Sequence, residues 1–186
     1  MNKLIYGINV GRILLGLCCI LSVQGCSKSG GSNSGNSGGA FLTCKINGQL
    51  HQFNSKVNAN QKPVTTTVHA VVVGGWEGED TGKAPGFGIT LTIPGTTGVK
   101  EATYAVAGTT DLELDGQYYI QNIQNGQVVS TTSYSGGRTA GTNFTLTITS
   151  LTDWGVKGTF SGLLRNGDNF LTITEGSFSA PYNSAH

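Results

Sequence analysis

The sequence predicts an all-β protein: a single antiparallel β-sandwich or barrel of about nine to ten strands, behind a signal peptide and a disordered Gly/Ser tether. Its composition favours strands and turns, because the 186 residues include 29 glycines and 23 threonines and only 11% of them are charged. Apolar residues alternate with polar ones over most of the chain, and Gly, Asn and Asp separate the alternating runs. No stretch carries apolar residues at helical spacing for three turns, so a βαβ fold is not expected.

The low charge excludes two classes of protein. The formal net charge is +1, whereas a nucleic-acid-binding surface needs a dense array of Lys and Arg. A coiled coil would be rich in Ala, Glu, Lys and Leu, and this chain is rich in Gly and Thr instead. Residues 40–186 keep eight basic and ten acidic side chains, so the expected domain does not attract phosphate or acidic lipid.

The first 25 residues have the parts of a secretory signal peptide. Met1–Arg12 carries Lys3 and Arg12 and no acid, and the apolar run Ile13–Leu21 follows. A membrane-spanning helix needs about 20 apolar residues, which this run does not reach. A buried core helix is the alternative, but a Gly/Ser tract follows the run where a packing partner would be needed. Residues 1–25 are therefore predicted to be removed on export.

The end of this segment, Val23-Gln24-Gly25-Cys26, resembles a bacterial lipobox. The resemblance rests on the aliphatic Val23, the small Gly25 and the cysteine itself; Gln24 departs from the small residue usual at its position. It implies cleavage before Cys26 and attachment of diacylglycerol and a further acyl chain, such as palmitate, to that residue. Each buried methylene contributes about 0.8 kcal/mol, so such chains would hold the protein on a bilayer. A soluble secreted protein cut nearby is the alternative.

Residues 26–39 form the expected tether, and residues 40–186 form the single all-β domain. Ser27–Gly39 contains only Ser, Gly, Asn and one Lys, which cannot bury apolar surface. Thirteen such residues have a root-mean-square reach of roughly 20 Å. The tether would lift the domain clear of lipid headgroups.

Strands in the domain are placed by alternation and by turn residues. Asn47-Gly48 separates the first two strands, and both positions tolerate the positive φ of a tight hairpin. The expected strands are Phe41–Ile46, Gln49–Phe53, Val64–Val73, Phe87–Ile93, Thr103–Ala107, Gly116–Ile123, Gln127–Tyr134, Asn143–Thr149, Val156–Leu164 and Asn169–Phe178. Alternation of apolar residues with Thr indicates sheets with one face inward and one face in water.

Cys44 is the one cysteine expected to remain free in the mature chain. Cys18 and Cys19 leave with the signal peptide and Cys26 carries lipid, so no internal disulfide is possible. A nucleophilic cysteine needs a nearby base, and His51 is close in sequence. Cys44 lies between Leu42 and Ile46 on one strand face, however, which predicts a core position.

The two ends of the domain resemble a group of small Bacteroidota outer-membrane lipoproteins of unknown function. The segments on which this resemblance rests are K-G-T-F-S-G at residues 157–162, I-T-E-G-S-F at residues 173–178, and C-K-I-N-G at residues 44–48. In that group a G-T-F strand pairs with a final I-T-x-G-x-F strand in a β meander. The resemblance implies a lipid-anchored β domain and implies no activity.

Four aromatic residues are candidates for stacking on the rings of a glycan: Trp76, Tyr118, Tyr119 and Trp154. Tyr118 and Tyr119 are adjacent, so one of them should point outward from a strand. The alternative is that these residues are core or strand-edge aromatics, which sheets favour in any case.

Two acidic groups are candidates for calcium, which prefers clustered oxygen ligands. They are Glu77, Glu79 and Asp80 in the expected loop 74–86, and Asp111, Glu113 and Asp115, which would share one face of a strand. If Leu112 and Leu114 face inward, however, these last acids are simply solvated. No catalytic residue and no cofactor is predicted. A zinc site in particular is not expected, since it needs three or four ligands and the domain offers Cys44 and two internal histidines.

The expected function is that of a lipid-anchored cell-envelope lipoprotein whose β domain binds a glycan or small molecule, or acts as a scaffold, without catalysis. Its expected partners are the outer membrane, through Cys26, and that ligand; the oligomeric state is open. Ser27 stands where some lipoproteins carry the Asp that retains them in the inner membrane, so the outer membrane is expected. The tether also lacks the acidic run that resembles a surface-export signal in Bacteroidota, so the periplasmic leaflet is favoured over the cell surface. The alternatives are a calycin-like barrel carrying a small apolar ligand, a subunit of a surface assembly, and a hydrolase.

Overall fold

The computed structural model describes residues 39–61, 67–95, 97–108 and 110–183. The predicted signal peptide, the lipidation site Cys26 and the tether up to residue 38 lie outside these residues. Every regular element in the described residues is a strand, which confirms the all-β class. None of the described segments is a helix with the length and apolarity needed to cross a membrane.

Within the described residues, eleven strands form a single mixed sheet. They are β1 (Phe41–Ile46), β2 (Gln49–Gln52), β3 (Ser55–Gln61), β4 (Ala70–Trp76), β5 (Gly86–Thr92), β6 (Thr103–Ala107), β7 (Glu113–Gln124), β8 (Gln127–Gly137), β9 (Asn143–Leu151), β10 (Gly155–Asn166) and β11 (Asn169–Asn183). The predicted turn at Asn47-Gly48 is confirmed, since both residues have positive φ.

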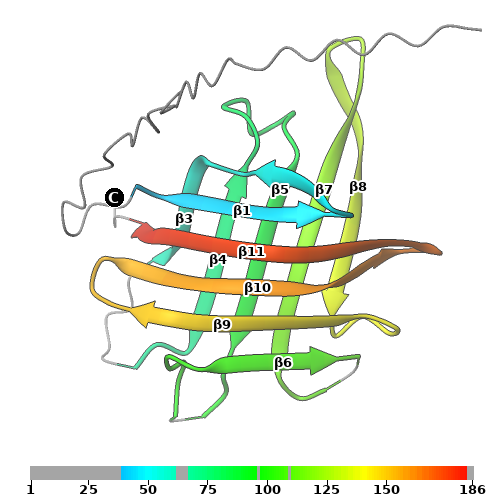
Figure 1. Cartoon of the computed structure of the whole chain (residues 1–186). Helices are drawn as coiled ribbons and strands as arrows, with labels where there is room; N and C mark the ends of the chain where they lie inside the picture. Colours follow the sequence, from blue (N-terminus) through cyan, green and yellow to red (C-terminus); the bar gives the residue numbers. More distant parts are fainter. Residues whose placement is uncertain (1–38, 62–66, 96, 109, 184–186) are drawn as a thin grey trace, which may run out of the picture. The chain divides into compact units, whose positions relative to one another are not determined.

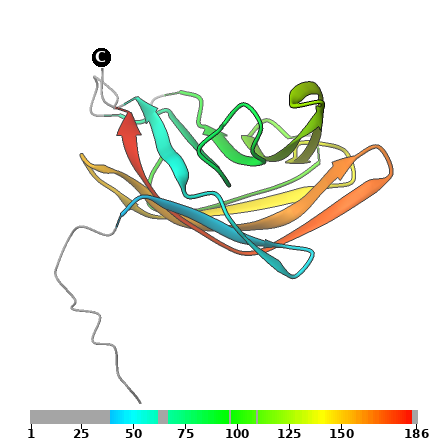
Figure 2. The same ribbon diagram turned by 90° about the horizontal axis from the view of Figure 1, so that it is seen from above.

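The strands are arranged in two layers. In Figure 1, β1, β11, β10, β9 and β6 run across the front, and β3, β4, β5, β7 and β8 run up and down behind them. Figure 2 shows the same two layers from above. We call the first layer, with β2 at its edge, the front sheet and the second layer the back sheet. Such crossing layers are typical of an orthogonal sandwich.

Two pairings at the corners join the layers. At one corner the end of β11 pairs with β3, in the one parallel pairing among the described strands, through Tyr182 and Ala59. At the other corner Arg165 of β10 pairs with Ser135 of β8. Because β10 also pairs with β11, the strands β3, β4, β5, β7, β8, β10 and β11 form a partial ring. The fold thus combines features of both predicted alternatives, a sandwich and a barrel.

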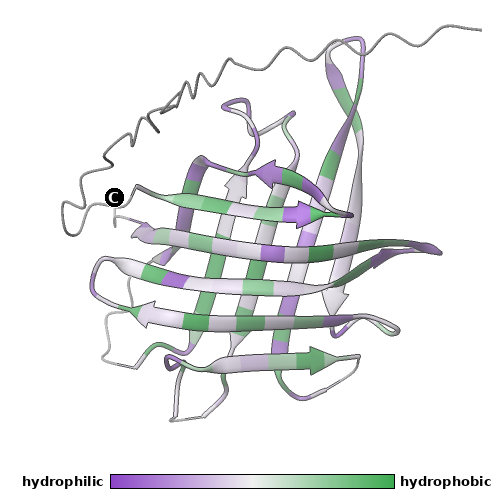
Figure 3. Cartoon of the chain, in the orientation of Figure 1, coloured by the Kyte–Doolittle hydropathy of each residue, from purple (hydrophilic) through white to green (hydrophobic). Residues whose placement is uncertain are grey.

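Phenylalanine rings fill the space between the layers. Phe87 of the back sheet lies 5.1 Å from Phe160 of the front sheet between ring centroids, and Phe160 lies 6.0 Å from Phe144 and 6.3 Å from Phe178. Phe53, which follows β2, lies 5.6 Å from Phe87. Apolar and polar residues alternate along the strands in Figure 3, so each sheet turns one face to this core and one to water.

Glycines make room for these rings. A Cβ on Gly116 of β7 would lie 2.1 Å from the Phe144 ring, and one on Gly176 of β11 would lie 2.6 Å from the Phe160 ring. Real Cβ atoms do not approach ring atoms so closely, so a side chain at either position would displace its ring. Some of the glycines in the strands therefore serve the packing of large rings between the sheets.

The structure differs from the sequence prediction most clearly around β3 and β4. β3 was not predicted, because Ser55–Gln61 is polar except for Val57 and Ala59, whose side chains are buried. The predicted strand Val64–Val73 is shifted, since the strand observed runs from Ala70 to Trp76; its first residues, 64–66, lie outside the described part of the chain. Trp76 consequently stands on a strand and not in a loop.

Candidate functional site

The outer face of the back sheet carries a depression of about 720 Å³. Strands β4, β5, β7 and β8 form its floor, and the segment after β8 forms one wall. The residues lining it with their side chains or glycine Cα atoms are Val72, Gly74, Gly88, Thr90, Asp115, Gln117, Tyr119, Ser135, Arg138 and Thr139. We call this depression the back groove.

Two paired glycines form the middle of its floor. Gly74 of β4 and Gly88 of β5 are register partners, so neither strand raises a side chain there. A Cβ on Gly88 would meet only the Val73 carbonyl, at 3.8 Å, and one on Gly74 only the Phe87 carbonyl, at 3.9 Å. These glycines, unlike Gly116, are therefore not required by packing inside the protein. Glycine in a strand at such a site lets another molecule approach the backbone closely.

The glycine row continues into polar side chains. Gly88 pairs with Gln117 of β7, and Gln117 pairs with Ser135 of β8. The Gln117 Nε2 donates a hydrogen bond of 2.7 Å to the Ser133 hydroxyl, which fixes the orientation of the amide. The Gln117 carbonyl oxygen and the Ser135 hydroxyl thus stand beside the glycine floor as hydrogen-bonding groups.

An aromatic row lies beside the glycine row, two residues further along each of the strands β4, β5 and β7. Trp76, Gly86 and Tyr119 are register partners across β4, β5 and β7. A Cβ on Gly86 would lie 2.3 Å from the Tyr119 ring, so the ring lies down over the glycine. Burial raises the pKa of Tyr119 above its ordinary value, and its hydroxyl, like that of any tyrosine at neutral pH, is protonated and can donate a hydrogen bond. Two of the four predicted stacking residues, Trp76 and Tyr119, are brought together on one face.

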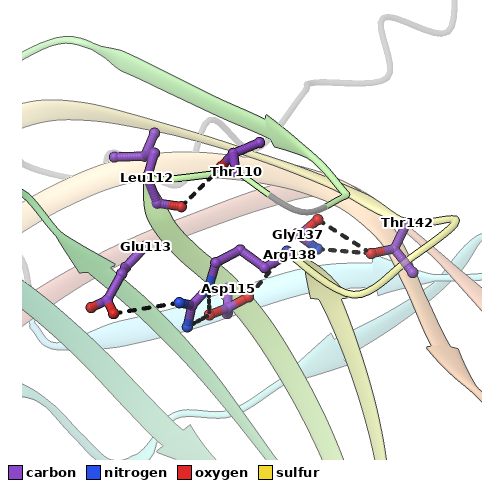
Figure 4. Close-up of polar contacts among 7 residues, drawn as sticks. All are labelled: Thr110, Leu112, Glu113, Asp115, Gly137, Arg138 and Thr142. Carbon is purple, nitrogen blue, oxygen red and sulfur yellow. Dashed lines mark hydrogen bonds and ion pairs between the residues drawn. The ribbon is translucent and has the colours of Figure 1, made fainter.

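An ion-pair cluster bounds the opposite end of the back groove. The Arg138 Nε donates a hydrogen bond of 2.8 Å to Asp115, and its Nη1 lies 3.4 Å from a Glu113 oxygen (Figure 4). The Arg138 backbone N–H also donates to Asp115, at 3.1 Å. Hydrogen bonding to Asp115 raises the pKa of Arg138, so the guanidinium keeps its charge. One guanidinium therefore forms ion pairs with two carboxylates at this wall.

The turn that presents Arg138 is held by Thr142. The buried Thr142 hydroxyl accepts a hydrogen bond of 3.0 Å from the Gly137 N–H and donates one of 2.6 Å to the Thr139 carbonyl. Gly137 has a φ of 109°, a conformation that L side chains rarely adopt. Figure 4 shows Gly137 between Thr142 and Arg138, so this wall is a defined turn.

The other two stacking candidates lie elsewhere. Tyr118 points into the core with 6% of its surface exposed, at 6.0 Å from the Phe53 ring, so it offers no face to a surface ligand. Trp154 lies in the turn between β9 and β10 of the front sheet, where it is 45% exposed. Neither contributes to the back groove.

Five of the six calcium candidates contact other side chains of the protein. Glu77 contacts His51 with 2.6 Å between Oε1 and Nδ1, and Glu79 accepts a hydrogen bond of 2.7 Å from the Ser55 hydroxyl. Asp80 lies 3.6 Å from the Lys83 amine. Glu113 and Asp115 share one strand face as predicted, whereas Asp111 lies before the strand; Arg138 pairs with the first two. Within the described residues, no three His, Cys, Asp or Glu side chains are grouped to hold a metal ion.

Cys44 lies in the core, as predicted, with no exposed surface. It is the register partner of His51, but burial raises the pKa of its thiol to about 12, and the charge of Glu77 acts in the same direction. A thiol so far from ionisation is a poor nucleophile at neutral pH.

The first prediction concerns this thiol and alkaline pH. Unfolded, the Cys44 thiol loses its proton near pH 9.0, whereas the folded chain retains it to about pH 12. The unfolded state therefore binds fewer protons in that range, and the free energy of unfolding should fall as pH rises above about 9. Denaturant titration of residues 40–186 at neutral pH and near pH 10 measures this fall, and Cys44→Ala should reduce it. Rapid reaction of the native thiol with a disulfide reagent at neutral pH would contradict the buried assignment.

The sequence left the glycine floor and Arg138 unassigned. Adjacent G-G and G-x-G steps in strands were a visible signal at Gly74 and Gly88, but which strands would meet was not. Arg138 had no local signal, because its partner Asp115 is 23 residues away. Comparison with protein-family models, with curated proteins and with solved structures finds no match to this chain.

Proposed function

We propose that this protein is a lipid-anchored cell-envelope lipoprotein that binds an uncharged glycan in the back groove. The observation that carries the proposal is the paired glycine floor, which is open above and bordered by the Tyr119 ring, with Trp76 on the same face beyond the groove lining. A sugar ring presents an apolar face to an aromatic ring and hydroxyls to amides and hydroxyls around it. Gln117, Ser135 and Thr90 supply such polar groups.

The charges of the back groove favour a neutral ligand and binding over catalysis. Arg138 is paired with Asp115 and Glu113, so the wall has no unpaired cation for a phosphate or carboxylate. A hydrolase would use two carboxylates placed on opposite sides of a bond. Asp115 and Glu113 instead stand on one strand and share one arginine.

The alternative of an apolar ligand carried inside the barrel has less support. The layers are in contact through the rings of Phe53, Phe87, Phe160 and Phe144, with centroid separations of 5.1 to 6.0 Å. An apolar ligand between the layers would have to displace these rings from close packing.

A second prediction tests the back groove. Gly88→Val should leave the fold intact, because the added Cβ would make only an ordinary contact with the Val73 carbonyl at 3.8 Å, and should block the floor. The probe is a panel of uncharged hexasaccharides (cellohexaose, laminarihexaose, maltohexaose, mannohexaose) titrated calorimetrically into residues 40–186. We expect at least about a tenfold loss of affinity, equal to about 1.4 kcal/mol, for whichever sugar binds.

The matched control is Thr92→Val. Thr92 stands on the same outer face of β5 but outside the back groove, so this variant should bind like the original chain. Tyr119→Ala should weaken binding as Gly88→Val does, because it removes the stacking ring. Failure of the whole panel to bind, or full affinity in Gly88→Val, would rule out the proposed site.

A third prediction tests the anchor. Cys26→Ala removes the acceptor for acyl chains, and one chain of methylenes at about 0.8 kcal/mol each is already enough for measurable membrane affinity. We expect the variant to move from the membrane pellet to the soluble fraction of the native cell, while Cys44→Ala stays in the pellet. A Cys26→Ala protein that still pellets would disprove the lipid anchor.

A further inference from the structure

Two exposed aromatic residues and a lysine lie together at one end of the front sheet. Phe41, which begins β1, is 36% exposed, and Trp154, in the turn before β10, is 45% exposed. The Lys157 amine lies 5.8 Å from the centre of the Trp154 ring. We call Phe41, Trp154 and Lys157 the tether-end patch. In Figure 1 it belongs to the left-hand end of the front sheet, where β1 and β10 begin.

The strand register makes this patch continuous. Phe41 pairs with Ser179 of β11, and Ser179 pairs with Lys157 of β10, so Phe41 and Lys157 flank one serine on the same outer face. Ser179 has only 2% of its surface exposed, and its hydroxyl has no hydrogen-bond partner among the described residues. A serine on an outer face becomes buried only when its neighbours cover it. The aromatic and lysine side chains therefore form one surface.

The chain outside the structure indicates what covers this surface. Only 14 residues separate the proposed acylation site Cys26 from Phe41, which limits their separation to at most about 50 Å. Phe41 is itself a member of the tether-end patch, and among the described residues only Gly39 and Ala40 lie closer along the chain to the acyl chains. Another group of exposed apolar side chains, Ile123, Val128 and Val129, lies at the tip of the β7–β8 hairpin, far from this end in both views (Figures 1 and 2).

The chemistry of the patch suits the interface of a bilayer. Tryptophan is favoured at the headgroup level, where its ring is in the apolar layer and its N–H meets water. A lysine beside it can reach a headgroup phosphate while its stem covers apolar surface. The turn also contains Asp153, so the local charge is balanced and a zwitterionic headgroup is sufficient.

We propose that the tether-end patch docks on the surface of the bilayer that holds the acyl chains of Cys26; this inference rests on the acylation proposed above. Docking would fix the orientation of the domain, which the length of the tether alone does not. The back groove lies on the outer face of the opposite sheet and would then face away from the lipid. A glycan could reach it from the aqueous side.

The experiment uses the two tryptophans of the mature, acylated chain as reporters. Trp76→Phe leaves Trp154 as the only tryptophan, and Trp154→Phe leaves Trp76 on the back sheet. Each variant is reconstituted into phosphatidylcholine vesicles with ordinary or brominated acyl chains, and co-flotation with the vesicles is measured first. In brominated vesicles we expect Trp154 to lose about half of its emission and to shift to shorter wavelength, whereas Trp76 keeps its emission. Phe41→Ser should reduce the quenching of Trp154, and Val129→Ser should not.

The outcomes separate the inference from the proposal beneath it. A chain that floats with the vesicles while Trp154 stays unquenched contradicts docking and leaves the anchor intact. A chain that does not float contradicts the anchor, and docking with it. A Trp154 emission that responds to the hexasaccharide panel and not to brominated lipid would identify the patch as a sugar contact and overturn the proposed docking.

Discussion

Phe160→Ala is expected to lower the free energy of unfolding by about 3–5 kcal/mol, the largest effect of any single substitution considered for this protein. Phe160 is 4% exposed and connects the two layers, since its ring lies 5.1 Å from Phe87 of the back sheet and 6.0 Å from Phe144 of its own. Alanine removes the ring and leaves a cavity that its neighbours fill only in part. Because a domain of this kind has a total stability of about 5–15 kcal/mol, the variant should be partly unfolded at moderate temperature.

Denaturant titration of residues 40–186 measures this loss, and Phe170→Ala is the matched control. Phe170 is 46% exposed and lies under the Arg165 guanidinium at 5.5 Å, so its removal leaves no cavity. We expect the control to lose well under about 1 kcal/mol. Equal losses in the two variants would mean that Phe160 does not join the layers as the ring contacts indicate.

Gly116→Ala is expected to have the second-largest effect, a loss of about 1–3 kcal/mol from a single added methyl group. Its Cβ would lie 2.1 Å from the Phe144 ring, and the same ring also packs closely on Gly162, where a Cβ would lie 2.6 Å away. The ring has no exposed surface and no direction in which to move freely. The strain must therefore appear as a displacement of β7 from β9.

Gly88→Ala provides the contrast. Gly88 stands on the strand next to β7, but on its outer face, where the added Cβ would meet only a carbonyl at 3.8 Å. Thermal unfolding should show this variant close to the original chain and Gly116→Ala well below it. The double variant Gly116→Ala with Phe144→Leu should recover part of the loss, because the smaller side chain makes room. If the double variant instead loses the sum of the two single losses, the clash with the Phe144 ring is not the cause of the loss in Gly116→Ala.

For several strands the alternation of residues was sufficient to predict which side is buried. Leu42, Cys44 and Ile46 face the core as expected, and Phe87, Ile89 and Leu91 are buried at alternate positions of β5 in the same way. The reason is local: successive side chains on a strand point to opposite faces, so the buried face can be read from period two alone. The same pattern misses β3, whose Val57 and Ala59 are too few to stand out among polar neighbours.

The back groove illustrates what alternation cannot predict. Tyr118 and Tyr119 are neighbours in sequence, and the period of the strand requires only that one points in and the other out. That Tyr119 is the outward one, that it lies on Gly86, and that Trp76 stands beyond it all depend on the register of three strands. The four stacking candidates were predicted only because they are aromatic. The strand register places one of them in the core, two on the back sheet and one beside the front sheet.

The amino-acid order by itself determined the strand class, the inward residues, the Asn47-Gly48 turn and the expected export and acylation signals, because each depends on residues within a few positions of one another. Only the tertiary structure decided that Gly74 meets Gly88, that Arg138 reaches back 23 residues to Asp115, and that Phe41 and Lys157 flank the same serine. These contacts depend on which strands become neighbours, and that choice is made by packing across the whole sandwich, for which no short stretch of sequence carries the information.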